Sequence, residues 1–376
     1  MTSLLVLSVS AGAGHVRAAD ALVKAAEAAH PPLAATHIDV LTLVPQEFKK
    51  LYGEQYIRLV EKMPQLWSFL YSKSDRPSRD SLVGKLKRAA EKLNTRKLSA
   101  EIERLAPDVI LCTHFLPAEL LSRERGQDKK KGRKLPRLWV QVTDFDVHAL
   151  WVHPNVDRYC VANEEVAFRL ADRGVPREKI SITGIPVMPQ FSAPLERAAC
   201  ARELGLSPDK FTVLMMAGGA GVGSLDELAE RLLRLPDDMQ LVALAGRNAE
   251  LLKRLQALAK RHPGKLFPLG FTTTVERVMT AADLVVTKPG GLSVSECLAK
   301  HRPMLLVSPI PGQEERNADY LLEAGAALKA VDGATLAFKL ARLLADRPRL
   351  AAMSAAAARI SRPQAGADVI ALISSS

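Results

Sequence analysis

Residues 284–296, LVVTKPGGLSVSE, place a short apolar run directly before two glycines and a helical pattern. The order of strand, glycine turn and helix predicts a βα unit with Gly290 and Gly291 at its turn. Glycines at a helix start leave main-chain N–H groups and the positive end of the helix dipole open to a diphosphate. Ser293 lies in the first turn. Glu296, about a turn further in, suits the two hydroxyls of a ribose; its alternative role is a glutamate that merely favours the dipole.

The same order of strand, turn and helix recurs along the chain. Apolar runs alternate with helical patterns at residues 4–10, 37–40, 109–112, 138–142, 159–162, 180–183, 211–216, 241–245, 265–269 and 304–307. This alternation predicts an α/β fold with two doubly wound, Rossmann-like domains. Such sheets bind ligands at the carboxyl ends of their strands, so we expect the two domains to face a central cleft.

The domain limits are predicted from composition. Residues 184–194 hold three prolines and no helical period, so they are the predicted linker. We expect a first Rossmann-like domain at 1–186, a second at 187–360 and a closing helix at 361–376. The charged stretch 123–137, with two glycines and a proline, is predicted to be a loop.

Composition excludes several classes of protein. The chain has 376 residues, of which 48% are hydrophobic and 25% charged, proportions unlike those of disordered, collagenous or multi-spanning membrane chains. Its four cysteines lie far apart, which argues against a disulfide scaffold or a zinc knuckle. No apolar run approaches 18 residues and the start lacks a basic leader, so neither a transmembrane helix nor a signal peptide is predicted. We expect a cytoplasmic protein.

The charge of the chain is concentrated in one region. The formal net charge is +11, and residues 47–137 carry 22 Lys and Arg against 12 Asp and Glu. Trp67, Phe69 and Tyr71 lie in the same region. Basic and aromatic residues together predict docking on an anionic membrane surface, at the inner face of the cell membrane. The alternative is that the aromatic residues belong to the core and the charges to a solvated face.

Two further glycine turns are candidate sites. Gly12-Ala13-Gly14 precedes His15, whose position at a helix start favours a neutral imidazole that accepts a proton; a plain βα turn with a surface histidine is the alternative. Gly218 and Gly219 follow the first strand of the second domain and are a further candidate for holding phosphate.

Polar residues after the run 304–307 are candidates for binding a sugar. Gln313, Glu314 and Asn317 lie within one helical turn and suit a polyhydroxylated ring, although an exposed capping loop is also consistent with them. Asp144 and Asp146, with His148 and His153 nearby, form a D-x-D pattern, and a metal site is one interpretation of it. We expect no metal, because a helix terminus already neutralises a diphosphate, and we expect Asp144 and His148 to shape the acceptor site.

Five motifs together resemble a known family. They are SVSAGAGH at 8–15, VTDFDVHALWVHP at 142–154, TGIP at 183–186, KPGGLSVSE at 288–296 and PGQEERNA at 311–318. In this order they resemble the monogalactosyldiacylglycerol synthase and processive diacylglycerol glucosyltransferase family, which is similar to the peptidoglycan-precursor N-acetylglucosaminyltransferase. The basic insert at 126–136 matches no motif of the family.

The resemblance implies a GT-B fold in which 1–186 is the acceptor-binding domain and 187–360 the UDP-sugar-binding domain. It also implies an inverting, metal-independent transfer of a hexose from UDP-glucose or UDP-galactose to diacylglycerol or a related lipid, without a cofactor. It implies that Gly290, Gly291 and Ser293 hold the diphosphate, Glu296 the ribose, and Gln313, Glu314 and Asn317 the sugar. Phe271 would lie by the uracil. His15 would be the base, with Asp144 as a second candidate for that task.

The sequence also allows other functions. A transferase for another lipid-linked or polyol acceptor and a UDP-N-acetylglucosamine 2-epimerase would use the same fold. A basic nucleic-acid-binding protein is disfavoured, because aromatic residues make up only 5% of the chain and none lies beside the Lys129–Lys131 run.

Overall fold

The computed structural model describes residues 2–10, 12–44, 96–129, 135–216, 225–235 and 238–376. The chain forms two compact units, each with its own sheet. The first unit comprises residues 1–189, 310–313 and 364–376, and the second comprises 190–309 and 314–363. The predicted fold class, two doubly wound α/β domains, is confirmed.

The first sheet has six strands in the order β2-β1-β3-β4-β5-β6, and every neighbouring pair is parallel. Their bounds are β1 Ser3–Ser8, β2 Ala34–Asp39, β3 Val109–Cys112, β4 Arg137–Gln141, β5 Arg158–Val161 and β6 Ile180–Ile182. The strand order changes direction between β1 and β3. That is the point at which open α/β sheets bind their ligands, at the carboxyl ends of the strands.

The second sheet is also parallel and has the order β12-β11-β10-β7-β8-β9. Its strands are β7 Phe211–Met216, β8 Met239–Gly246, β9 Leu266–Gly270, β10 Leu284–Thr287, β11 Met304–Val307 and β12 Ala327–Ala330. Counted within this unit and from the other edge, the order is 3-2-1-4-5-6, that of a dinucleotide-binding sheet. Its change of direction lies between β7 and β10.

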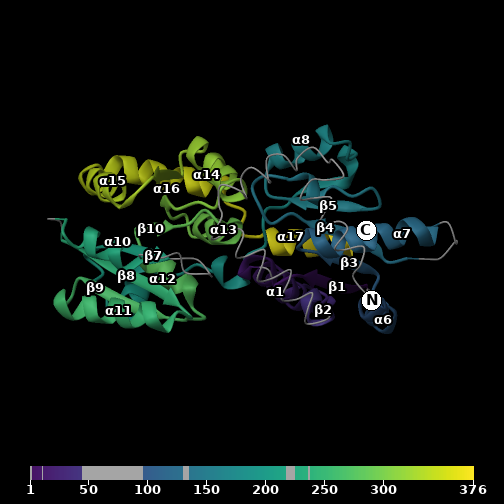
Figure 1. Cartoon of the computed structure of the whole chain (residues 1–376), viewed down its shortest axis with the longest axis horizontal. Helices are drawn as coiled ribbons and strands as arrows, with labels where there is room; N and C mark the ends of the chain where they lie inside the picture. Colours follow the sequence, from purple (N-terminus) through teal and green to yellow (C-terminus); the bar gives the residue numbers. More distant parts are fainter. Residues whose placement is uncertain (1, 11, 45–95, 130–134, 217–224, 236–237) are drawn as a thin grey trace. The chain divides into compact units, whose positions relative to one another are not determined.

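Helices connect the strands (Figure 1). In the first unit they are α1 Ala13–Ala28, α6 Arg96–Leu105, α7 Phe115–Lys129, α8 Glu164–Asp172 and α17 Ala365–Ser374, with the short η3 Ala149–Trp151. In the second unit they are α9 Arg197–Glu203, α10 Leu225–Leu232, α11 Ala249–Arg261, α12 Val275–Ala281, α13 Gly291–Ala299, α14 Gln313–Glu323, α15 Gly333–Ala345 and α16 Arg347–Ile360. None of the described helices is both long and apolar enough to cross a bilayer.

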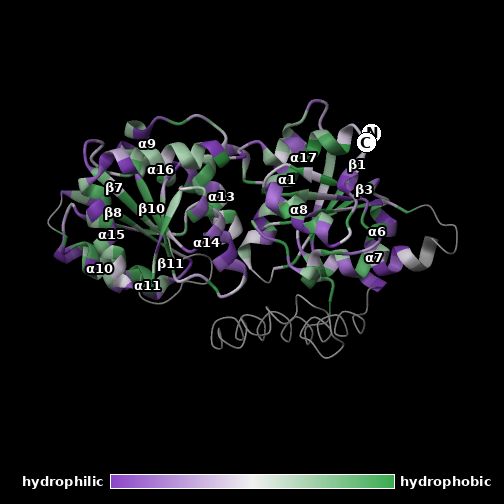
Figure 2. Cartoon of the chain, turned by 90° about the horizontal axis from the view of Figure 1, so that it is seen from above, coloured by the Kyte–Doolittle hydropathy of each residue, from purple (hydrophilic) through white to green (hydrophobic). Residues whose placement is uncertain are grey.

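Both faces of each sheet are covered. All six residues of β7 are buried, as expected for a central strand with helices on either side. In the first unit, α7 and α8 pack on one face, and α1 and α17 pack on the other. Figure 2 shows hydrophobic strands between helices whose outer residues are hydrophilic.

Two expectations for secondary structure were wrong. The predicted loop at 123–137 begins as helix, because α7 continues through Gly126 to Lys129; its Glu, Arg, Gln and Lys residues are good helix formers. The edge strand β12 was missed, since ALKA has no apolar run and alanine is depleted in strands.

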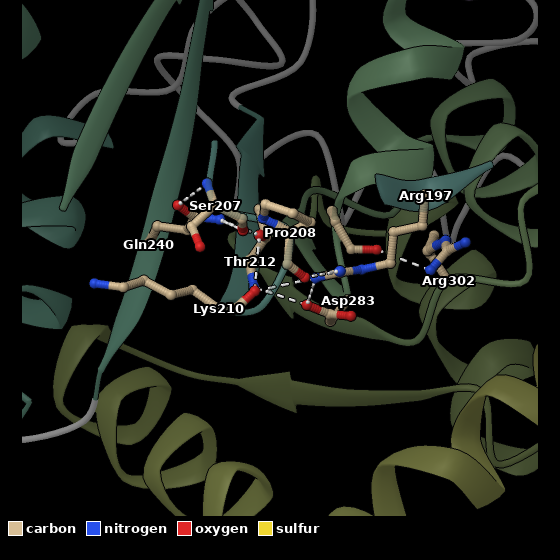
Figure 3. Close-up of polar contacts among 9 residues, drawn as sticks. Arg197, Ser207, Pro208, Lys210, Thr212, Gln240, Asp283 and Arg302 are labelled. Carbon is tan, nitrogen blue, oxygen red and sulfur yellow. Dashed lines mark hydrogen bonds and ion pairs between the residues drawn. The ribbon is translucent and has the colours of Figure 1, made fainter. Parts of the chain in front are cut away.

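A polar network lies at the amino-terminal edge of the second sheet, opposite the edge expected to bind ligand (Figure 3). Asp283, just before β10, accepts hydrogen bonds from Arg197 Nη2 at 2.6 Å and from the Thr212 main chain at 2.8 Å. Arg197 also donates to the Pro208 and Lys210 carbonyls. These bonds tie α9 and the starts of β7 and β10 together, so we assign this network to stability.

Candidate active site

His15 lies at the point where the first sheet changes direction. It is in the first turn of α1, directly after β1, and Thr113 follows β3, the strand next to β1. The His15 Nδ1 donates to the Thr113 carbonyl oxygen at 2.9 Å, and the Thr113 hydroxyl donates to the His15 carbonyl at 2.9 Å. The carboxyl ends of β1 and β3 therefore hold this imidazole in place.

The His15 imidazole is neutral at physiological pH. Burial lowers its pKa from 6.5 to about 4, and the hydrogen bond to Thr113 offsets this only in part. The sequence correctly predicted a neutral ring, but burial, rather than the helix terminus, is the main cause. A neutral imidazole with a lone pair accepts a proton from a hydroxyl that it contacts.

Aromatic rings surround His15. The His114 ring lies edge-on to it with centroids 4.6 Å apart, and the Trp151 ring lies 6.3 Å away. Phe115 packs on both His114 and Trp151. Burial, and then the charge interaction with His15, hold the pKa of His114 well below 6.5. These rings give the imidazole a site of low polarity.

The D-x-D pattern lies after β4, and both of its carboxylates have protein partners. Asp144 accepts a hydrogen bond from Gln313 Nε2 at 2.6 Å, and Asp146 lies 3.3 Å from Arg169 Nε. His148 Nδ1 accepts from the Leu150 main chain. Within the described residues, no group of three or more His, Cys, Asp or Glu side chains has a geometry that would hold a metal ion.

The glycine turn of the second unit lies where that sheet changes direction. Gly290 precedes α13 and Gly291 is its first residue. The first described main-chain bond at this helix end runs from Val294 N–H to the Gly290 carbonyl at 3.0 Å. Ser293 is half-buried in the first turn and Glu296 is buried in the second. The turn therefore has the form of an anion site.

Helix α14 packs against this turn within the second unit. Glu314 Oε1 lies 3.6 Å from the position that a Cβ on Gly290 would take. Asn317 is fully buried and donates from Nδ2 to the Pro289 carbonyl at 3.1 Å. The structure thus brings Glu314 and Asn317 to the glycine turn, and places Gln313 beside Asp144 in the first unit.

Phe271 follows β9 at the carboxyl edge of the second sheet. Its side chain is 57% exposed, and the Arg247 guanidinium lies 4.6 Å from the centre of its ring. Arg247 itself follows β8. An exposed phenyl ring at this edge is consistent with the predicted place beside a uracil.

Some predicted features lie outside the described residues. Gly218 and Gly219 are among them, as are Trp67, Phe69 and Tyr71 and most of the basic region 47–137. Their predicted roles stay predictions.

A Ser–His–Asp series occurs near β1 but is closed to substrate. The Ser8 hydroxyl lies 2.7 Å from His37 Nε2, and His37 Nδ1 lies 2.8 Å from Asp20. Ser8 has no exposed surface. The series therefore links β1, β2 and α1, and it is not a nucleophilic triad.

Several residues of the site were missed by sequence reasoning. Thr113, His114 and Thr143 follow β3 and β4 directly, and Trp151 ends η3. Their place after predicted strands was the available signal. Thr143 and Trp151 also belong to the motif at 142–154, and none of the four was singled out.

Two family models match the chain. The model described as monogalactosyldiacylglycerol (MGDG) synthase matches residues 15–187, and the glycosyltransferase family 28 C-terminal domain matches residues 212–369. The first covers His15 and the D-x-D segment, and the second covers the glycine turn before α13. Together they define a two-domain glycosyltransferase.

Curated relatives identify the family. The processive diacylglycerol beta-glucosyltransferase of Bacillus licheniformis is 30% identical over 93% of this chain and 88% of its own length. The enzyme of the same name from Bacillus pumilus is 35% identical over 70% of this chain and 67% of its own. The chain therefore belongs to the monogalactosyldiacylglycerol synthase and processive diacylglycerol glucosyltransferase family.

Solved structures show the same fold at low identity. MurG of Acinetobacter baumannii superposes with a TM-score of 0.60 at 15% identity, each chain covered fully. MnaA of S. aureus in complex with UDP gives a TM-score of 0.64 at 14% identity, covering 98% of this chain and 95% of the other. At such identities the likeness supports the GT-B fold alone.

Proposed function

We propose that the protein transfers a hexose from a UDP-sugar to diacylglycerol or a related lipid, with inversion and without a metal or cofactor. The observation that carries the proposal is His15, a neutral imidazole held at the carboxyl ends of β1 and β3 in a chain of this family. The relatives named above are diacylglycerol glucosyltransferases, which supports a lipid acceptor.

His15 acts as the general base of a single displacement. Nε2 takes the proton of the acceptor hydroxyl while the hydroxyl oxygen forms a bond to the anomeric carbon. The bond between that carbon and the UDP oxygen breaks, and its electron pair leaves with UDP. Because the acceptor enters opposite the leaving group, the configuration inverts. Asp144 is a second candidate for orienting this hydroxyl.

The second unit binds the donor. The N-terminus of α13, with Gly290, Gly291 and Ser293, receives the diphosphate, where its N–H dipoles stabilise the charge that develops on UDP. Glu296 takes the ribose, Phe271 the uracil, and Glu314 and Asn317, with Gln313, the hexose. Gly218 and Gly219 contribute to the phosphate site.

The basic region 47–137 docks the protein on the inner face of the cell membrane, where the lipid acceptor resides. Its net charge of +10 favours anionic headgroups. A variant with Lys130, Lys131, Arg133 and Lys134 neutralised would bind anionic vesicles more weakly. Equal binding would remove the insert from this role.

The test incubates the purified protein with UDP-glucose or UDP-galactose and vesicles that contain diacylglycerol. We expect a glycolipid in the organic phase with inverted anomeric configuration, unchanged by EDTA, and lost in His15→Asn. If a product forms only with another lipid-linked acceptor, diacylglycerol is not the acceptor and this part of the proposal is replaced. An epimerised UDP-sugar formed without acceptor would refute the proposal, and loss of activity in EDTA that metal restores would refute its metal-free form.

A further inference from the structure

Two threonines surround the His15 ring nitrogen Nδ1. Besides the Thr113 carbonyl at 2.9 Å, the Thr143 hydroxyl oxygen lies 3.0 Å from it. Thr113 follows β3 and Thr143 follows β4, and both side chains are buried. Two neighbouring strands therefore present oxygen atoms to the same nitrogen.

These contacts determine where the ring carries its proton. A carbonyl oxygen only accepts hydrogen bonds, so His15 Nδ1 must donate and must carry the hydrogen. The Thr143 oxygen then accepts from the same N–H. In a neutral ring the other nitrogen, Nε2, has the lone pair. Nε2 makes no hydrogen bond within the described residues. It is also accessible to solvent, since the buried polar atoms that lack a partner do not include it.

The partners of Nδ1 are uncharged. No Asp or Glu of the described residues hydrogen-bonds to His15, and the titratable side chain that faces it is His114. His114 Nδ1 accepts a hydrogen bond from the Leu116 main chain at 3.0 Å, so its own ring is oriented independently. A carboxylate at Nδ1 would raise the basicity of the ring; two neutral oxygens orient it while leaving it weakly basic.

We propose that Thr113 and Thr143 are positioning residues that hold His15 in the tautomer with hydrogen on Nδ1, so that the Nε2 lone pair is ready for the acceptor proton. This inference rests on the proposed function for its catalytic consequence, but the tautomer itself is independent of it. When Nε2 gains the proton, both threonine oxygens also stabilise the imidazolium through Nδ1–H.

The first test is spectroscopic and needs no activity. The chain has eight histidines, so the NMR spectrum of protein labelled with ¹⁵N-histidine contains eight sets of ring signals. Those of His15 are identified by their loss in His15→Asn. At pH 7 we expect the proton on Nδ1 and an unprotonated Nε2. Thr143→Val removes one of the two oxygens at Nδ1 and leaves the Thr113 carbonyl, so it should increase the population with the proton on Nε2 only in part, and Thr143→Ser should restore the parental spectrum. Thr280→Val is the matched control, since it removes a buried hydroxyl bond in α12 of the second unit. A parental His15 with the proton on Nε2, or unchanged spectra in Thr143→Val, would overturn the inference.

The second test is kinetic. Thr143→Val should lower kcat by about tenfold, the loss expected for one hydrogen bond, with the KM for UDP-sugar unchanged. Thr143→Ser should recover most of this loss. If the parent transfers hexose and its proton is on Nε2, the positioning role fails and the function stands. If the Nδ1 tautomer is found in a protein that transfers no hexose, the proposed function fails instead, and with it the catalytic consequence of the tautomer.

Discussion

The buried carboxamide of Asn317 donates to the main-chain carbonyl of Pro289, 3.1 Å away. Asn317 lies in α14, and Pro289 lies one residue before the Gly290–Gly291 turn. The glycine turn is therefore tied to a helix that follows the next strand of the sheet. This hydrogen bond ties the turn to α14.

Replacement of Asn317 by alanine should loosen this turn. We expect the free energy of unfolding to fall by about 1–3 kcal/mol, because the buried Pro289 loses a hydrogen bond to its carbonyl, and the KM for UDP-sugar to rise. Urea denaturation and donor kinetics measure the two effects. Ser354→Ala is the control, since its exposed bond to the His301 carbonyl holds no part of the site. Full stability and unchanged donor KM in Asn317→Ala would contradict this account.

Replacement of Gly290 by alanine should impair donor binding without harming the fold. Its φ of −69° suits any residue, and the new Cβ would lie 3.6 Å from Glu314, an ordinary contact. We expect an unchanged Tm and a donor KM raised by about tenfold or more, since the methyl occupies the phosphate approach. Gly325→Ala should lower the Tm and leave the donor KM unchanged, because a side chain at a φ of 78° costs about 1 kcal/mol of stability. A donor KM unaffected in Gly290→Ala would remove this turn from the donor site.

His15→Asn should reduce catalysis and leave the donor bound. The asparagine amide replaces the Nδ1–H donor to Thr113, but nothing replaces Nε2. We expect kcat to fall by roughly 10²–10⁴, with UDP affinity by calorimetry unchanged. His301→Asn is the matched control, because His301 is exposed in the second unit and asparagine tolerates its φ of 54°. Near-parental kcat in His15→Asn would exclude His15 as the base.

Stability should fall as the pH drops from about 6.5 to 4. Burial lowers the pKa of His15 to about 4 in the folded state, whereas the unfolded chain has its ordinary value near 6.5. Between these values the unfolded state binds a proton that the folded state does not, so stability rises with pH in this window. Across this pH range, His15 changes the free energy of unfolding by at most about 3 kcal/mol. His114, whose pKa is also lowered, acts in the same direction. Chemical denaturation at pH 4.5 and 7 should show a smaller difference in His15→Asn than in the parent; equal differences would contradict the shift.

Arg197→Leu should destabilise the second unit and leave the donor KM unchanged. Arg197 donates to three acceptors in two segments of the amino-terminal edge, and its loss leaves Asp283 with fewer partners (Figure 3). We expect a loss of about 2 kcal/mol, since the pair is only partly buried. Arg261→Leu, from an exposed pair with Glu230, should cost less than about 1 kcal/mol. Equal losses in both variants would show that the network contributes no more than a surface pair.

Strands covered on both faces were the easiest elements to predict. Those at Val109–Cys112, Phe211–Met216 and Met304–Val307 have the predicted bounds, because burial on both sides makes them continuous apolar runs. The edge strand Ala327–Ala330 has half-buried residues and lacks this pattern.

The site was predictable where one local segment carries it. His15 and Gly290 each follow a strand within a few residues, so their turns are visible in the sequence. The contacts of His15 are not, since Thr113 and Thr143 lie 98 and 128 residues further along. Only the placement of β3 beside β1 and of β4 beside β3 brings them to the same ring.

Helix α17 has a consequence for synthesis. Val369, Ile370 and Ile373 complete the core beneath α1, and Gly366 lies so close to α1 that an added Cβ would be 3.2 Å from Ala25. During translation, β1 to β6 therefore leave the ribosome before the α17 part of the cover on one face has been made, whereas the second unit, 190–309 and 314–363, precedes α17 in the chain. The unit that begins first is completed last, since its core lacks Val369, Ile370 and Ile373 until residues 365–374 emerge.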